Sequence, residues 1–123
     1  MATVVREKCL NTRSWLAGTW WLVLVAFLVL SLLPNRYLQH RVFDWWDKAQ
    51  HASAFAALAM LGLRCWPKSA WGVLFGMLMY GAAIEWLQHL TGWRRGEWSD
   101  LAADAVGLGL AAVCSRFFSE ARL

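Results

Sequence analysis

Charged residues are scarce in this chain of 123 residues, because Lys, Arg, Asp and Glu make up 16% of it while 59% of the residues are hydrophobic. A soluble domain carries roughly 25% charged residues. A chain this short also exposes too much surface to hide so many apolar side chains. The composition therefore predicts a membrane protein with room for one domain.

The signatures of several protein classes are absent from the sequence. It contains no Gly-rich phosphate loop, no Gly-x-Ser-x-Gly elbow and no Cys-x-x-Cys pair. Its three cysteines, Cys9, Cys65 and Cys114, lack the spacing of metal ligands, so we interpret them as reduced, structural thiols. The net charge of +4 is scattered over short connections rather than gathered on one face, which argues against nucleic-acid binding.

One apolar run, residues 15–33, has 19 residues and no charge. At 1.5 Å per residue it is long enough to cross a hydrocarbon layer of about 30 Å. A basic segment, residues 1–14, precedes it, and no small-residue cleavage site follows it. We therefore expect a retained membrane span with a short cytoplasmic N-terminal segment, rather than a signal peptide.

Three further helices are expected, each apolar in part and bounded by polar residues: 48–66, 69–91 and 99–118. They qualify as membrane spans only if their polar ends face one another rather than lipid. The short turns between them suit antiparallel neighbours, and small residues such as Gly72, Gly76 and Gly107 allow close helix packing. The sequence thus predicts an all-α, four-transmembrane-helix antiparallel bundle over residues 15–123. A single anchor followed by a small soluble helical domain is the alternative.

Four spans would place both termini on the same side of the membrane. That side carries seven basic residues against five on the opposite side, and it also holds all three cysteines. Cytoplasmic connections are enriched in Lys and Arg, and thiols stay reduced in the cytoplasm. We therefore expect both termini to be cytoplasmic.

Ionisable side chains inside apolar helices are costly, so they are treated as candidates for a functional site. The predicted topology brings the start of the second helix, the end of the third and the start of the fourth to the non-cytoplasmic face. Spacings of three and four residues place the polar groups of each helix on one side of it. The candidate site residues are Asp47, Lys48, His51, Glu85, Gln88, Arg94, Asp100 and Asp104.

The order of these residues follows a pattern that covers about half of the chain. It reads Asp47-Lys48-x-x-His51-x-x-x-Phe55, then Gly81-x-x-x-Glu85-x-x-Gln88, then Arg94, Asp100, Asp104 and Gly107. In this pattern the sequence resembles the VanZ-like family of small bacterial membrane proteins, although many members carry Asn where this chain has Asp104. The resemblance implies a multi-pass protein of the bacterial cytoplasmic (inner) membrane with a role in the cell envelope. The family's founding member is associated with low-level resistance to the glycopeptide teicoplanin.

The first interpretation of the cluster is a site that binds, or also modifies, an anionic amphiphile at the outer leaflet. An envelope lipid, a lipid-linked precursor and a lipoglycopeptide all fit this description. Lys48 and Arg94 would hold the headgroup, while Glu85 and Gln88 would position it. Several tryptophans near these residues suit a membrane–water interface.

Three other interpretations stay open. His51 could act as a general base oriented by Asp47 with Glu85 as its partner, but no nucleophile is evident, so the sequence does not decide whether the protein is an enzyme. A divalent cation could be held by ligands drawn from His51, Glu85, Asp100 and Asp104, and no other cofactor is indicated. Alternatively, the polar network only fixes helix packing in a structural or accessory membrane subunit. A homo-oligomer is compatible with each of these.

Overall fold

A computed structural model describes residues 1–34, 44–92 and 97–120 of the chain. The ordered elements of these ranges are α1 (Ala2–Leu32), α2 (Asp44–Cys65), the short 3-10 turn η2 (Pro67–Ser69), α3 (Ala70–Thr91) and α4 (Trp98–Glu120). The predicted all-α class with four helices is confirmed. The bounds of α2, α3 and α4 lie within four residues of those expected from the sequence.

The first helix differs from the prediction, because α1 begins at Ala2 rather than near residue 15. Residues 2–14 contain no Pro or Gly, so nothing in them stops the helix. The basic segment is also in contact with the rest of the chain. The Arg13 Nε–H donates a hydrogen bond of 2.7 Å to the carbonyl of Cys65, the last residue of α2. This bond satisfies one of the carbonyl groups that a helix leaves unpaired at its C-terminus.

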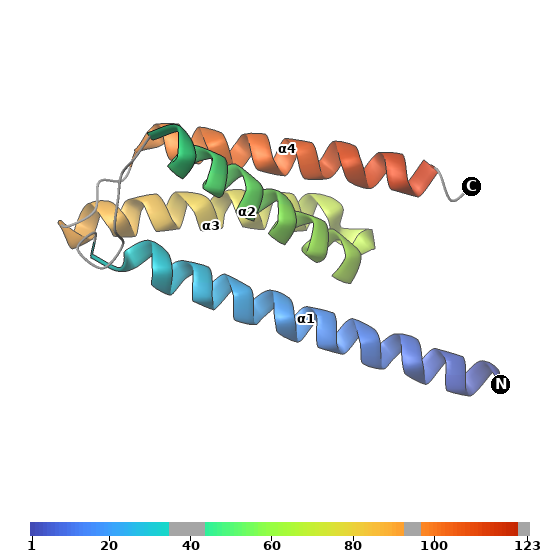
Figure 1. Ribbon diagram of the computed structural model, residues 1–123. Coiled ribbons are helices and arrows are strands. Elements are labelled where there is room, and N and C mark those ends of the chain that lie inside the picture. Colours follow the sequence, from blue (N-terminus) through green and yellow to red (C-terminus); the bar gives the residue numbers. More distant parts are fainter. Residues whose placement is uncertain (35–43, 93–96, 121–123) are drawn as a thin grey trace.

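The four helices alternate in direction along the bundle (Figure 1). The N-terminal end of α1 and the C-terminal end of α4 lie at the same end of the molecule, and the first turns of α1 extend away from the other helices. The opposite end gathers the last turns of α1 and α3 and the first turns of α2 and α4. Within the described ranges α2 contacts all three other helices, most extensively α4, whereas α1 and α4 do not touch.

Within the described parts of the chain, three segments are long and apolar enough to cross a membrane: Ala2–Leu32, Pro67–Thr91 and Trp98–Glu120. Large apolar side chains point outward along all three, as Leu22, Phe75 and Leu110 illustrate. Such a surface suits contact with lipid rather than water. Helix α2 is not among these segments, because charged and polar residues occupy its first two turns.

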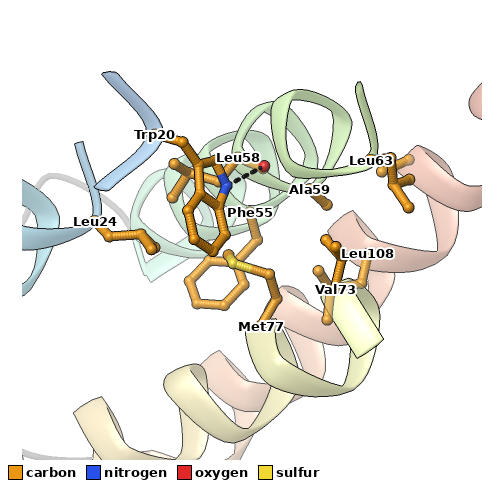
Figure 2. Close-up of a cluster of buried hydrophobic side chains, with 10 residues drawn as sticks. Trp20, Leu24, Phe55, Leu58, Ala59, Leu63, Val73, Met77 and Leu108 are labelled. Atoms are coloured by element: carbon orange, nitrogen blue, oxygen red, sulfur yellow. Dashed lines mark hydrogen bonds between the residues drawn. The ribbon is translucent and has the colours of Figure 1, made fainter. Parts of the chain in front are cut away.

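The apolar core lies between the helices toward the middle of the bundle (Figure 2). Phe55 of α2, Met77 of α3 and Leu108 of α4 are buried in it. The Trp20 side chain of α1 completes the core, and its indole N–H donates a hydrogen bond of 2.9 Å to the Leu58 carbonyl of α2. A buried indole needs such a partner, so this bond allows the largest core side chain of α1 to pack without an unsatisfied donor.

Glycines set the closest helix approaches, although only some of those expected from the sequence do so. A Cβ on Gly107 of α4 would overlap the Ala52 carbonyl of α2, which confirms close packing at that position. The expectation for Gly76 is wrong, because an added Cβ there would meet nothing within 4 Å. A Cβ added to Gly72 would meet only the Ser69 side chain, at 3.8 Å. Gly62, which the sequence analysis did not single out, lies against Val73 and Trp20.

Replacing Gly107 with Ala is expected to destabilise the fold by about 1–3 kcal/mol, because the new methyl group forces α2 and α4 apart. The matched control is Gly109→Ala on the same helix, where an added Cβ meets nothing within 4 Å. That variant should be neutral or more stable by up to about 1 kcal/mol, since Ala is the better helix former. Thermal unfolding in detergent measures both. Equal stability of the two variants would contradict the close α2–α4 approach.

Candidate functional site

Buried polar side chains gather at one end of the bundle. Among the described residues they are Ser31, His51, Glu85, Gln88, Asp100 and Asp104. Each lies in the turns nearest the end where α1 and α3 finish and α2 and α4 begin. We call this end of the molecule the polar end. Burying such groups is costly unless they are paired, so their partners decide what the cluster can do.

A pair between His51 of α2 and Asp104 of α4 forms the centre of the cluster. The His51 Nδ1 lies 3.1 Å from Asp104 Oδ1, and the two side chains are 8% and 1% exposed. The Phe27 ring of α1 meets the His51 ring edge-on, with centroids 5.8 Å apart. Gly81 of α3 makes room for the carboxylate, because a Cβ there would lie 2.8 Å from Asp104 Oδ2. Few contacts with water remain, which strengthens the electrostatic part of this interaction.

Glu85 of α3 is also buried, and its two oxygens differ. Oε2 accepts a hydrogen bond of 2.7 Å from the backbone N–H of Glu97, the residue before α4. A carboxylate at this position satisfies an unpaired donor at the helix N-terminus and interacts favourably with the helix dipole. Oε1 is buried and has no hydrogen-bond partner among the described residues. Oε2 therefore fixes the start of α4, whereas Oε1 can still accept a hydrogen bond or bind a cation.

Lys48 pairs with an exposed carboxylate rather than with the buried ones. Its Nζ lies 3.8 Å from Oε2 of Glu97, with 35% of the Lys48 side chain and 53% of the Glu97 side chain exposed. An ion pair that is this accessible to solvent contributes little to stability. Glu97 is a further residue of the site that the sequence did not predict. Its backbone N–H contacts Glu85 across the connection between α3 and α4, and helical residue spacing predicts contacts only within one helix.

Gln88 is buried, and its side-chain amide joins two helices. Its Nε2 donates a hydrogen bond of 2.8 Å to the Ser31 carbonyl near the end of α1. A helix carbonyl at the C-terminus needs such a donor. This hydrogen bond thus anchors α3 to α1. Like Glu97, Ser31 is a residue of the polar end that was not predicted from the sequence.

The remaining predicted residues are described to different extents. Asp100 is 7% exposed and lies one turn before Asp104 on α4. Arg94 lies outside the described residues, and of Asp47 only its place in α2 is described. The predicted roles of these two residues therefore stay predictions. Ser99, a serine near these residues in the sequence, is exposed and donates a hydrogen bond to Glu97.

The arrangement brings three of the predicted residues together from three helices. His51, Glu85 and Asp104 each offer a donor atom, and these atoms all lie within 4.8 Å of one another. The cluster can accept protons, hydrogen-bond donors or a cation. The chain matches no protein-family model, no curated protein and no solved structure. The chemistry of these residues is accordingly the basis on which a function is inferred.

The His51–Asp104 pair is expected to show strong energetic coupling. His51→Ala or Asp104→Ala leaves a buried polar group without its partner, so each should cost about 2–4 kcal/mol. The double variant should cost clearly less than the sum of the two, which a double-mutant cycle of thermal unfolding measures. The matched control is the half-exposed pair Lys48 and Glu97, for which coupling below about 1 kcal/mol is expected. Additive effects at His51 and Asp104 would contradict the pairing.

Proposed function

We propose that the chain is a VanZ-like, multi-pass protein of the bacterial inner membrane whose polar end binds the headgroup of an anionic envelope amphiphile. The amphiphile would be an envelope lipid, a lipid-linked precursor or a lipoglycopeptide. The observation that carries this proposal is the gathering of every buried polar side chain of the described residues at one end of an otherwise apolar bundle. Helix packing alone does not require the costly groups to be concentrated in this way.

The depth of the cluster suits a headgroup. Glu85 lies six residues before the end of α3 at Thr91, which corresponds to about 9 Å at 1.5 Å per residue. Each headgroup region adds roughly 5–8 Å to the hydrocarbon thickness of a bilayer, so Glu85 would lie near the inner boundary of that region when the end of α3 is at the water surface. Trp86 and Trp98 lie near the same end and are 64% and 82% exposed. Exposed tryptophans are typical of the membrane–water interface, so the polar end fits that level.

Two cations are proposed to hold the anionic part of the headgroup. Lys48 is partly exposed at the outer margin of the cluster, and its ion pair with Glu97 is long enough to exchange for another anion. Arg94 is assigned the same role from its sequence position in the connection between α3 and α4. The unpaired Oε1 of Glu85 would accept a hydrogen bond from a hydroxyl or amide of the ligand.

The proposal includes α2 as a fourth span, with both termini in the cytoplasm. A helix with polar residues can lie within a membrane where those residues face protein rather than lipid. Helix α2 meets this condition at His51, which is buried against α4. At 22 residues it would be about 33 Å long, which is enough to cross the hydrocarbon layer. The polar end would then face the outside of the cell membrane.

A purely structural role is the second candidate. The bonds from His51 to Asp104 and from Gln88 to Ser31 each join two helices, and both are buried. Such bonds fix the relative positions of helices in a membrane without any ligand. In this case Glu85→Gln would lower stability without changing lipid binding per folded molecule.

Lipid binding separates these two functions. Lys48→Ala is expected to weaken binding of an anionic phospholipid about fivefold, since one basic residue near an anionic surface contributes about 1 kcal/mol. Arg94→Ala should weaken it to a similar degree. Native mass spectrometry of the folded protein with anionic and zwitterionic phospholipids measures the effect. The control is Lys68→Ala, in the turn at the opposite end of the bundle, which should bind as the wild type does. Wild-type binding by both test variants would contradict the proposal.

Thiol labelling tests the proposed orientation. Cys9 is exposed near the N-terminal end of α1, and Ser99 is exposed at the polar end. With Cys114→Ser as the background, a membrane-impermeant maleimide should label Cys9 only after the cells are permeabilised. Adding Cys9→Ser and Ser99→Cys should give labelling in intact cells, because that position would face outward. Labelling of Cys9 in intact cells would contradict cytoplasmic termini.

A further inference from the structure

We infer that His51, Glu85 and Asp104 form a binding site for one divalent transition-metal ion. The three residues come from α2, α3 and α4, and all three are buried. Their donor atoms lie within 4.8 Å of one another. The inference goes beyond binding of an amphiphile and does not depend on it.

The unpaired oxygen of Glu85 is the independent observation that points to a ligand. Oε2 of this carboxylate is held by the Glu97 N–H, which orients the whole group. Oε1 is buried without a hydrogen-bond partner among the described residues, and a carboxylate oxygen of Glu85 lies within 4.8 Å of a donor atom of both His51 and Asp104. A buried acceptor that lacks a donor costs free energy. A metal cation bound to Oε1 would accept its electron pair and so remove this cost.

The charge balance of the cluster points the same way. Of the three buried carboxylates of the polar end, Glu85 and Asp104 belong to this group, and no Lys or Arg of the described ranges forms an ion pair with either. Lys48 pairs instead with the exposed carboxylate of Glu97. The pair with His51 compensates at most one of the two charges. A divalent cation would compensate both, and metal coordination is one of the ways in which proteins accommodate buried charges.

The distances are close to those of a bound ion. Two atoms that each lie 2.0–2.2 Å from one ion are at most about 4.4 Å apart. The His51 Nδ1 and Asp104 Oδ1 are 3.1 Å apart and already satisfy this limit. A donor pair at the 4.8 Å limit of the group needs to close by only a few tenths of an ångström. Small side-chain rotations accomplish such a movement.

The ligand set indicates the class of metal. One imidazole with two carboxylates suits Zn²⁺, Mn²⁺ or Fe²⁺, whereas Mg²⁺ and Ca²⁺ prefer oxygen ligands alone. The group contains no thiolate, which disfavours Cu⁺. Three protein ligands also leave a coordination position for water or an exogenous group. Glu97, whose backbone holds Glu85, is exposed, so the site lies just beneath the surface of the polar end.

Metal titration of the full-length protein in detergent tests the inference. Cys9→Ser and Cys114→Ser remove the two exposed thiols from the background, and the protein is first stripped with a chelator. Elemental analysis after dialysis against micromolar Zn²⁺ or Mn²⁺ should give about one ion per chain, with a raised thermal midpoint. Mg²⁺ at the same concentration should produce neither effect.

Ligand variants then locate the ion. Glu85→Gln, Asp104→Asn and His51→Ala should each weaken binding by at least about 100-fold, since even residues one shell beyond the ligands cost 10–100-fold. His89→Ala is the matched control for His51, because His89 is an exposed histidine on α3 near the same end. Glu120→Gln is the control for the carboxylates, at the opposite end of α4. Both controls should bind as the background protein does.

Two results would overturn the site. One is a background protein that holds less than about a tenth of an ion per chain and shows no thermal shift. The other is a His51→Ala protein that binds as tightly as His89→Ala. If the ligand variants do not fold, the absorption spectrum of Co²⁺ added to the background protein tests the site instead. An intense d–d absorption would support a low-coordinate site of nitrogen and oxygen ligands. The spectrum of the aqueous ion would refute it. Titrations contain no added lipid, and lipid binding can be measured with chelator present, so the two proposals fail separately.

Discussion

The burial of Glu85 and Asp104 in an apolar helical bundle is the constraint on which the rest of the polar end depends. Asp104 is kept from solvent by the His51 ring on one side and by Gly81 on another. Glu85 is kept in place by the backbone N–H of Glu97, the residue before α4. Burying a carboxylate in such surroundings costs free energy unless the group has partners. Because these partners lie on neighbouring helices, each contact also fixes the position of one helix relative to another. Helix packing and site geometry are therefore parts of the same arrangement.

Close contact between α2 and α4 makes this arrangement possible. Gly107 lies against the Ala52 carbonyl, one residue after His51 on α2 and three residues after Asp104 on α4. The missing side chain brings the two backbones near enough for the imidazole and the carboxylate to meet. Gly81 contributes from α3 by leaving space for the second carboxylate oxygen. Residues without side chains thus position the residues that carry chemistry.

The sequence predicts some of these features well, and the reasons are physical. Apolar length and the spacing of polar residues in threes and fours predict four helices and place His51, Glu85 and Asp104 in one cluster, as the structure confirms. Contacts made by backbone groups are not predictable in this way, so Glu97 was missed as the donor to Glu85. The packing role expected for Gly76 is wrong, because composition alone does not say which face of a helix meets a neighbour.

The hydrogen bond of the Trp20 indole fixes the position of α1 along α2. Its N–H reaches the Leu58 carbonyl because Gly62, one turn farther along α2, has no side chain in the way. A directional bond between these two helices prevents α1 from sliding along α2 by a turn. Helix α1 has an uncharged stretch of 19 residues, which is long enough to cross a hydrocarbon layer. If α1 spans a membrane, the bond of Trp20 would also set the level of the buried carboxylates relative to that layer.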